Sequence, residues 1–390
     1  MDAIVAKSEA AEHERLVLDM VDKFLEAEVR PHVHALEHDD VYPAEIVEKM
    51  KEMGLFGCTI AAEYGGLGLS TSTYAKIIER MSAVWMSISG IVNSHLIMAM
   101  VVQRNGTDEQ KQKFLPRFAT GELRGGVGLT EPDCGTDLQA IRTVAKRAGN
   151  NDYVVNGRKT WITNSLHGNC IALLVKTDPH ATPRHKGMSV LIAEKGPGFT
   201  VSRKLEKLGY KGIDTCELAF DDYKVPADRL VGGVEGRGLQ QILNGLELGR
   251  INVAARGVGV ADAALREAVA YSQVRKTFGK PICEHQAIQL KLGDMATRLE
   301  AARLLTYRAA EAYDRGERCD MEAGMAKLFA TEAAMENSLE AMRIHGAYGY
   351  SKEFSIERLY RDAPLLVIGE GTNELQRIII AKQLIERNRA

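Results

Sequence analysis

The stretch Asp152-Tyr-Val-Val-Asn-Gly-Arg-Lys-Thr-Trp-Ile-Thr163 marks the point where a helical sequence changes to a β pattern. Two β-favouring runs, residues 153–155 and 158–163, flank the dipeptide Asn156-Gly157. Because Asn-Gly readily supplies the positive φ angles of a type I′ turn, the stretch predicts a β-hairpin. Further apolar runs at 171–175, 188–193 and 216–220, separated by Pro, Gly and Asp, extend the prediction to an antiparallel β domain.

Helical patterns flank this β region on both sides. An amphipathic segment opens the helical stretch from Glu14 to about Phe118, and Pro31 is expected to interrupt it. Gly65-Gly66 and Gly68 predict a loop. After about Gly238 an apolar stripe predicts a long helix, with two more helices behind it, the last opening after Gly371-Thr372. The opening segment carries Leu16, Leu18, Met20, Val21, Phe24 and Leu25; the stripe carries Ile288, Leu292, Met295, Leu299, Ala302, Leu305 and Ala309; Asn373 and Gln376 fit a capping box.

The predicted fold class is therefore α+β, mainly α. We expect an N-terminal α-helical domain over residues 1–122, a central antiparallel β domain over 123–232 and a C-terminal helical bundle over 233–390. A chain of 390 residues has room for two or three such domains, at about 100–200 residues each.

Composition excludes several classes of protein. Lys+Arg 50 against Asp+Glu 52 leaves a net charge of -2, so nothing predicts binding to nucleic acid or to an anionic membrane. The six cysteines are scattered without metal-ligand spacing, which is typical of a reduced, cytoplasmic protein. The N-terminal residues show no secretory or transit pattern. Met81–Val102 carries no formal charge, but its Ser, Asn and His residues favour a buried helix over a membrane span.

Three common catalytic or binding patterns are missing from the sequence. No GxGxxG motif follows a strand, no P-loop lysine appears and no serine nucleophile elbow is present. His32, His34 and His38, near Asp39 and Asp40, could suggest a metal site. A solvated helix end after Pro31 is the favoured interpretation, because no tetrahedral ligand set is apparent, and no metal is predicted.

Two segments carry polar groups that could meet a ligand. Residues 130–137, Thr-Glu-Pro-Asp-Cys-Gly-Thr-Asp, form a turn rich in donors, and Trp161 and Thr163 share one strand face. Together they could hold a planar polar heterocycle, although a core Trp beside an ordinary turn explains them slightly better. Glu370, within Ile368-Gly-Glu-Gly-Thr372, could approach a ligand closely, but alone this motif is more often a helix-capping turn.

Taken together, these segments resemble the acyl-CoA dehydrogenase family. The resemblance runs in order along nearly the whole chain, from Glu63-Tyr-Gly-Gly-Leu-Gly68 to Gln376-Arg377. The strongest matching segments are Leu129-Thr-Glu-Pro132 with Gly135-Thr-Asp137, Trp161-Ile-Thr-Asn164, Asp214-Thr-Cys-Glu-Leu218, Arg275-Lys-Thr-Phe-Gly279 with His285-Gln-Ala287, and Glu370-Gly-Thr-Asn-Glu374.

The resemblance implies the same three domains, with a β-barrel-like middle domain and a C-terminal four-helix bundle, and a homotetramer that binds FAD between subunits. It also implies a role for residues that match the family motifs. Val127, Leu129 and Thr130 would bond the flavin edge; Thr136 would contact FAD and the CoA part of the substrate; Trp161 and Thr163 would contact the isoalloxazine and phosphate arm; Arg275, Phe278 and Gln286 would reach the FAD of a neighbouring subunit; Thr372, Glu374, Arg343 and Gly346 match adenine contacts; and Glu247, Arg250 and Gly371 match the substrate site.

The resemblance also identifies the catalytic base. Family members place it either before the Gly-Thr of the last motif or on the helix at Glu247-Leu-Gly-Arg250, where this chain has Gly249. Glu370 is therefore the predicted base. It would take the α-proton of an acyl-CoA while the β-carbon passes hydride to flavin N5, giving a trans-2-enoyl-CoA. Donors to the thioester oxygen would be the Glu370 amide and a ribityl hydroxyl of FAD.

The implied enzyme acts on a short or medium acyl-CoA, with a branched acyl group as an option, in fatty acid metabolism and β-oxidation. Its electron acceptor would be electron-transfer flavoprotein. Gly369 replaces a bulky aromatic residue of many members, which predicts a wider pocket beside Cα. The alternatives are a flavin oxidase or monooxygenase on the same fold, and a non-catalytic flavin- or CoA-binding scaffold, against which the presence of Glu370 argues.

Overall fold

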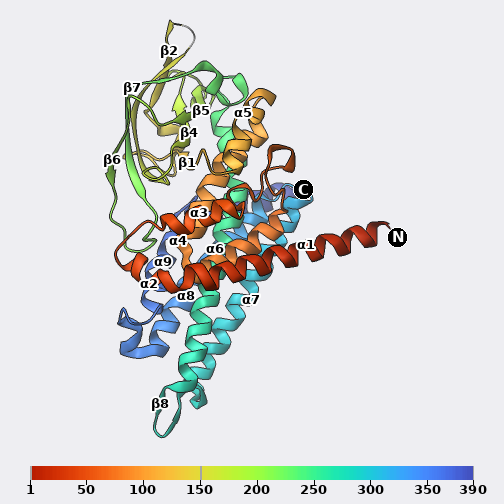
Figure 1. Cartoon of the computed structure of the whole chain (residues 1–390), viewed down its shortest axis with the longest axis vertical. Coiled ribbons are helices and arrows are strands. Elements are labelled where there is room, and N and C mark those ends of the chain that lie inside the picture. The colour runs from red at the N-terminus through yellow and green to blue at the C-terminus, as the bar shows by residue number, and fades with distance from the viewer. Residues whose placement is uncertain (1, 150–151, 390) are drawn as a thin grey trace.

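The computed structural model describes residues 2–149 and 152–389. Figure 1 shows three parts along the long axis: the strands of the middle segment at one end, the long C-terminal helices at the other, and the N-terminal helices beside their junction. The predicted class, mainly helical α+β with a central β domain, is confirmed. The exact domain limits at residues 122 and 232 stay predictions.

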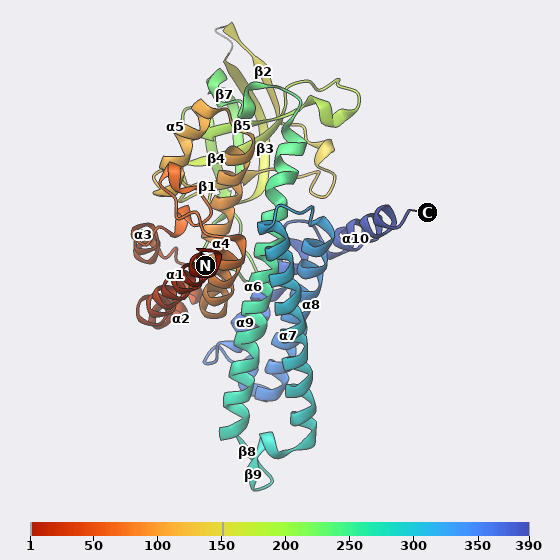
Figure 2. The ribbon, with the colours of Figure 1, turned by 90° about the vertical axis from the view of Figure 1, so that its right-hand side faces the viewer.

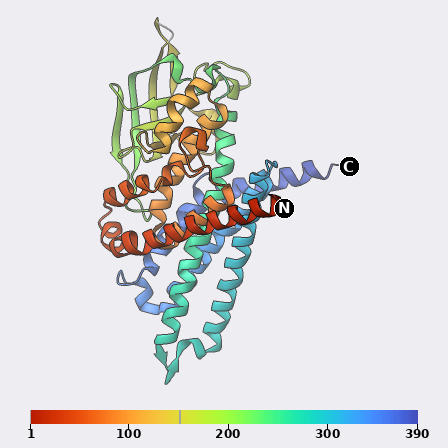
Figure 3. The ribbon, with the colours of Figure 1, turned by 45° about the vertical axis from the view of Figure 1, so that its right-hand side comes forward.

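The N-terminal part contains five helices. They are α1 (Asp2–Phe24), α2 (Arg30–His38), α3 (Ala44–Glu52), α4 (Thr71–Asn105) and α5 (Asp108–Ala119). Helix α1 lies across the helical part of the molecule (Figure 3) and contacts α4. Pro31 does not break the helical path as predicted. A π-helical turn, Leu25–Val29, leads directly into α2, and Pro31 stands in its first turn, where a missing backbone N–H is tolerated.

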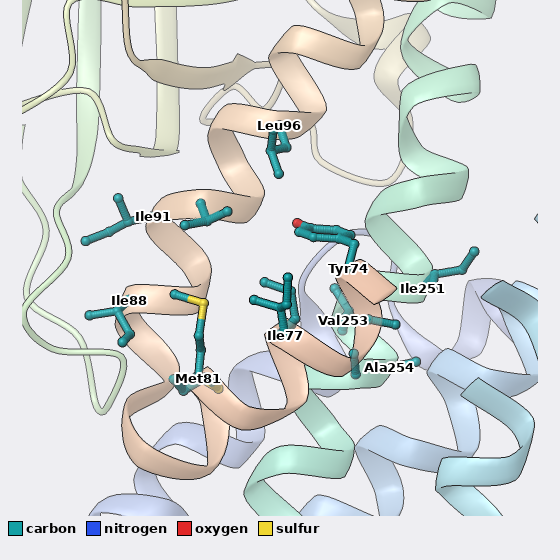
Figure 4. Close-up of a cluster of buried hydrophobic side chains, with 14 of the residues drawn as sticks. Tyr74, Ile77, Met81, Ile88, Ile91, Leu96, Ile251, Val253 and Ala254 are labelled. Atoms are coloured by element: carbon teal, nitrogen blue, oxygen red, sulfur yellow. The ribbon is translucent and has the colours of Figure 1, made fainter. Parts of the chain in front are cut away.

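Helix α4 forms the core together with α6 (Gly238–Val274). Apolar side chains of both helices, including Ile77, Met81 and Val253, gather between them (Figure 4). By length and composition α4 could cross a membrane, but 94% of its most apolar window is buried inside the protein. The predicted buried helix over Met81–Val102 is therefore confirmed. The helix bends at Trp85, where φ is -157° and ψ is 108°.

The middle part is a seven-stranded sheet in the order β1-β4-β2-β3-β7-β6, with β5 paired to β4. Apart from two parallel contacts of β4, with β1 and at one position with β2, its pairings are antiparallel, so the purely antiparallel prediction is wrong in part. The connection between β1 and β4 contains β2 and β3, which makes a parallel crossover possible. The strands are β1 (Gly125–Gly128), β2 (Val144–Arg147), β3 (Tyr153–Thr163), β4 (Cys170–Lys176), β5 (Met188–Glu194), β6 (Phe199–Lys204) and β7 (Thr215–Val225).

The predicted turn at Asn156-Gly157 is wrong, because β3 runs through both residues. The hairpin lies earlier in the chain, where β2 pairs antiparallel with β3 and Arg147 lies opposite Tyr153. Gly157 instead sits at a register shift against β7, with φ 149°, and a Cβ there would come within 2.5 Å of the Thr143 hydroxyl oxygen. The glycine therefore permits a bulge and a close approach of two strands.

The C-terminal part adds α7 (Gln286–Asp314), α8 (Asp320–His345), α9 (Ile356–Ile368) and α10 (Asn373–Arg387). The stripe on α7 is confirmed, since Met295, Leu299, Ala302 and Ala309 are buried. Three helices follow it, not the predicted two. A two-stranded hairpin, β8 (Lys276–Thr277) with β9 (Lys280–Pro281), joins α6 to α7 at the end of the molecule far from the sheet (Figure 2).

The N-cap of the last helix is one residue earlier than the prediction. Thr372, not Asn373, is the N-cap of α10, and its hydroxyl accepts a bond from the Leu375 amide at 3.4 Å. The Asn373 side chain is engaged elsewhere: its Oδ1 accepts a hydrogen bond from Lys327 Nζ at 2.8 Å. A tertiary contact therefore overrides the local capping pattern.

Candidate active site

The turn between α9 and α10 presents Glu370. Glu370 has φ 55° and Gly371 has φ 91°, so two consecutive residues are left-handed, a strained conformation for a glutamate. The buried Lys327 holds this turn, since its Nζ donates to the carbonyls of Val367 at 3.3 Å and Gly371 at 2.9 Å. The left-handed backbone and the hydrogen bonds from Lys327 together direct the Glu370 carboxylate into the interior.

The carboxylate of Glu370 meets groups from two core helices. Its Oε1 accepts a hydrogen bond from Asn93 Nδ2 of α4 at 2.6 Å and one from Arg256 Nη2 of α6 at 3.1 Å. Its Oε2 is buried and has no hydrogen-bond partner among the described residues. That oxygen faces Gly249 of α6, where an added Cβ would lie 2.2 Å away. One oxygen is thus held and the other is left to accept a proton.

The surroundings raise the pKa of Glu370 above its ordinary value. Burial is the largest cause, because removing water disfavours the charged form. Arg256, the Asn93 hydrogen bond, Lys327 and Arg250 oppose that shift. A carboxylate that is harder to keep charged is a stronger base, which suits proton removal from carbon.

A second cluster lies where β1 meets β3. The buried Lys159 holds the segment that follows β1. Its Nζ donates to the carbonyl of Leu129 at 3.0 Å and to Glu131 Oε1 at 2.8 Å. Glu131 also accepts the amides of Arg142 at 2.6 Å and Thr143 at 3.0 Å. The segment around Leu129 and Thr130 is therefore rigidly positioned.

Trp161 stands beside this segment with its side chain 57% exposed. Its φ of 60° at a register shift in β3 turns the indole outward. The core interpretation of Trp161 is therefore wrong. The amide of Thr160 donates to the carbonyl of Thr130 at 2.9 Å, which joins the two segments. An exposed aromatic face beside a rigid polar turn can bind a planar heterocycle.

Comparison with known proteins decides the family. Three acyl-CoA dehydrogenase family models match the chain: the N-terminal domain over residues 11–122, the middle domain over 126–223 and the C-terminal domain over 236–385. The chain belongs to the acyl-CoA dehydrogenase family. It is therefore a flavin-dependent oxidoreductase with acyl-CoA dehydrogenase activity.

Similar acyl-CoA dehydrogenases extend over nearly the full chain. An acyl-CoA dehydrogenase of Bacillus subtilis is 42% identical over 94% of this chain and 96% of its own length. The butyryl-CoA dehydrogenase structure from Megasphaera elsdenii has a TM-score of 0.92 and 35% identity, covering 95% of this chain and 98% of that one. A chain from a structural study of the electron-transferring flavoprotein of Acidaminococcus fermentans and electron bifurcation has a TM-score of 0.92 and 37% identity, covering 95% and 97%.

Acyl-CoA dehydrogenases and their solved structural neighbours are FAD flavoproteins. The residues present here fit that group. Strand β1 lies at the edge of the sheet, so the outward backbone groups of Val127 and the N–H of Leu129, just after the strand, can meet a ligand edge, while the Leu129 carbonyl is held by Lys159. The Trp161 indole lies exposed nearby, while Thr163 ends β3. Thr136 lies in the exposed turn before residue 138.

Other residues predicted to contact FAD lie far from Trp161 within one chain. Arg275 caps the end of α6, Phe278 in the β8–β9 hairpin is 97% exposed, and Gln286 begins α7. Figure 2 shows that hairpin and the sheet at opposite ends of the molecule. Arg343 and Gly346 close α8 near this same end, since the Arg275 guanidinium lies 6.0 Å from the Tyr348 ring. One chain alone does not bring the two sets together.

The remaining predicted substrate and adenine residues lie on α6 and around the start of α10. Gly371 follows Glu370 directly, Thr372 caps α10 and Glu374 lies in its first turn. Arg250, the residue after Gly249, pairs with Asp320 at 3.4 Å, and Glu247 lies 3.8 Å from Arg104. Their contacts with FAD or acyl-CoA stay predictions.

Sequence reasoning did not identify two residues that contact Glu370, Asn93 and Arg256. A signal for Arg256 was present: it is the single charged residue in the apolar run from 251 to 261. Buried arginines are rare unless paired, so a lone charge inside an apolar helix marks a tertiary partner. Asn93 belonged to the polar residues that had argued against a membrane span.

Proposed function

We propose that this acyl-CoA dehydrogenase oxidises a short or medium acyl-CoA, branched acyl groups included, to the trans-2-enoyl-CoA. The observation that carries the proposal is the Glu370 carboxylate, with Oε1 held by Asn93 and Arg256 and Oε2 buried without a partner among the described residues. Similarity to the butyryl-CoA dehydrogenase supports the short acyl chain.

Glu370 acts as the base in the proposed reaction. Its Oε2 takes the proton from the carbon α to the thioester, and the electron pair of that C–H bond forms the new double bond. Residues 127–130, Trp161 and Thr163 would hold FAD, and the bound flavin would supply the chemistry that accepts a hydride from the β-carbon. Asn93 orients the carboxylate, and the backbone N–H of Glu370 is the proposed protein donor to the thioester oxygen.

The assembly and partner proposals rest on residues remote from Glu370. We infer a homotetramer in which Arg275, Phe278 and Gln286 reach the FAD of another subunit. Phe278 is 97% exposed in the single chain, and an apolar side chain of this size is expected to be covered by a partner. Electron-transfer flavoprotein is the proposed acceptor, supported by the match to the chain from the Acidaminococcus study. The proposed compartment is the cytoplasm.

Exchange of the base for its amide tests the proposal. A panel of acyl-CoA thioesters is added anaerobically to the FAD-loaded protein, and loss of flavin absorbance is followed. Glu370→Gln should slow bleaching by about 10²–10⁴-fold. The matched control Glu353→Gln, on an exposed residue away from the site, should leave bleaching unchanged. A protein that does not bind FAD, or a Glu370→Gln variant with full turnover, would contradict the proposal.

The same experiment separates the alternative flavin oxidase or monooxygenase. After substrate reduction the protein is exposed to air. A dehydrogenase should reoxidise slowly without an electron-transfer partner, whereas an oxidase should regain its colour rapidly.

A further inference from the structure

Arg256 holds one oxygen of Glu370 but takes part in no bond-making step of the proposed reaction. Only 5% of the residue is exposed. Its Nη2 donates to Glu370 Oε1 at 3.1 Å and its Nη1 to the Tyr210 hydroxyl at 3.2 Å, while its Nε has no partner among the described residues. An arginine in the apolar stretch of α6 must therefore serve more than local structure.

Arg256 lies on α6, and its side chain is more buried than that of Glu370, with 6% against 18% exposed. Arg256 follows Gly249 by two helical turns on the same face of α6, and both face the carboxylate of Glu370. The Tyr210 hydroxyl, which accepts from Arg256, lies against Gly90 of α4, where an added Cβ would be 1.5 Å from the hydroxyl oxygen. Asn93, the other partner of the base, lies one turn further along α4. Arg256, Tyr210 and Asn93 therefore lie together beside the carboxylate of Glu370.

This pairing conflicts with catalysis on a plain hydrocarbon chain. Arg256 stabilises the charged form of Glu370 and so weakens the base. When Glu370 takes a proton, the buried guanidinium loses its counter-charge. Lys327 lies below the same turn and adds a second positive charge. An alkyl end would also leave Arg256 Nε and Asn93 Oδ1, both buried, without partners.

We propose that the preferred acyl group carries a carboxylate at its far end, which binds Arg256 and Tyr210 in place of Glu370. The inference rests on the proposed function and names its substrate class. Binding then exchanges one ion pair for another: Arg256 stays protonated, the substrate carboxylate stays ionised, and Glu370 is released to act as base. The substrate itself completes the charge balance that proton transfer would otherwise break.

The geometry also limits the length of the acyl group. Proton transfer requires about 3 Å between the α-carbon and the base oxygen. The guanidinium lies 3.1 Å from the same carboxylate. The substrate carboxylate therefore follows the β-carbon within a few bonds, as in mono-CoA thioesters of short dicarboxylic acids.

Matched thioesters test the inference on the unaltered FAD-loaded protein. Succinyl-CoA and glutaryl-CoA are compared with 4-methylpentanoyl-CoA and 5-methylhexanoyl-CoA, whose terminal isopropyl groups replace the carboxylates at similar size. We expect at least one carboxylated thioester to bleach the flavin about 100-fold more efficiently than its isostere, the scale of a buried charged hydrogen bond. Equal or better bleaching by both neutral isosteres would overturn the inference and leave the proposed function intact.

Variants separate recognition from stability. Arg256→Gln should abolish the preference of carboxylated over neutral thioester, and Arg256→Lys should retain part of it, because the charge remains without the planar fork. The control Arg303→Gln removes a guanidinium that pairs with Glu79 and Asp262 outside the site, and should leave the ratio unchanged. A structural role for Arg256 would lower both activities together and overturn the inference.

A binding measurement keeps the two hypotheses apart when no thioester bleaches the flavin. That result would reject the proposed function. Flavin absorbance changes on titration with glutaryl-CoA and 5-methylhexanoyl-CoA then decide the inference. Tighter binding of glutaryl-CoA that Arg256→Gln abolishes supports it, and equal binding of the two thioesters contradicts it.

Discussion

The Glu370 carboxylate lies so close to Gly249 that a side chain at 249 would overlap it. A Cβ on Gly249 would lie 2.2 Å from Glu370 Oε2, closer than any non-bonded carbon and oxygen can approach. The two positions that the family resemblance offers for the base thus face each other across one small volume. A side chain on α6 and a carboxylate from the α9–α10 turn cannot both fill it. A side chain at 249 would displace the end of the Glu370 side chain from the position it has here.

Gly249→Ala should therefore impair catalysis without changing any polar group. The added methyl must push the Glu370 carboxylate away from the α-carbon, and we expect kcat/KM to fall by about 100-fold, as for a catalytic group displaced by about 1 Å. The measurement is flavin bleaching by the best acyl-CoA. The control is Gly293→Ala on α7, where a Cβ meets nothing within 4 Å. Full activity in Gly249→Ala would contradict the assigned geometry.

The acid limb of the pH profile should report Glu370. Burial raises the pKa of Glu370, and the base works only when deprotonated, so kcat/KM should fall as pH falls through that raised value. Asn93→Ala removes a hydrogen bond to the charged form, which raises the pKa further. The acid limb of this variant should move to higher pH. A limb that stays in place or moves to lower pH would contradict the role of Asn93.

Lys159→Met should destabilise the β domain. The variant leaves the buried Glu131 without its cation, and breaking a buried pair costs about 3 kcal/mol in free energy of unfolding. It also removes the donor to the Leu129 carbonyl and should loosen FAD. Urea unfolding and FAD titration measure both effects. The exposed pair of Lys113 with Asp228 provides the control, since Lys113→Met should change stability by less than about 1 kcal/mol.

Gly369 should allow branching near the α-carbon. It caps the end of α9 at φ -66° and ψ 152°, a conformation open to any residue, so a larger side chain can be introduced without backbone strain. We expect Gly369→Tyr to reduce turnover of α-branched acyl-CoA more than that of a straight chain of equal carbon count. The ratio of the two kcat/KM values measures it. A strict preference of the unaltered protein for straight chains would contradict the wider pocket.

Local patterns in the sequence determined the broad architecture. The stripe over residues 288–309 repeats within one helix, and the runs at 171–175, 188–193 and 216–220 are strands, because periodicity and β-propensity act between near neighbours. Asn156-Gly157 and the cap of α10 were misassigned for the same reason. At Gly157 the approach of Thr143 decided the conformation, and Lys327 engaged Asn373.

The sequence predicts Glu370 as the base, through its resemblance to the family motif and through the glycine at 249. Only the tertiary structure decided what surrounds that base. Asn93 is 277 positions from Glu370 and Arg256 is 114 positions away. No local pattern encodes such contacts, because they arise when three helices enclose one buried carboxylate and water is excluded. The basicity of Glu370 and its proposed selectivity are therefore properties of the packed core.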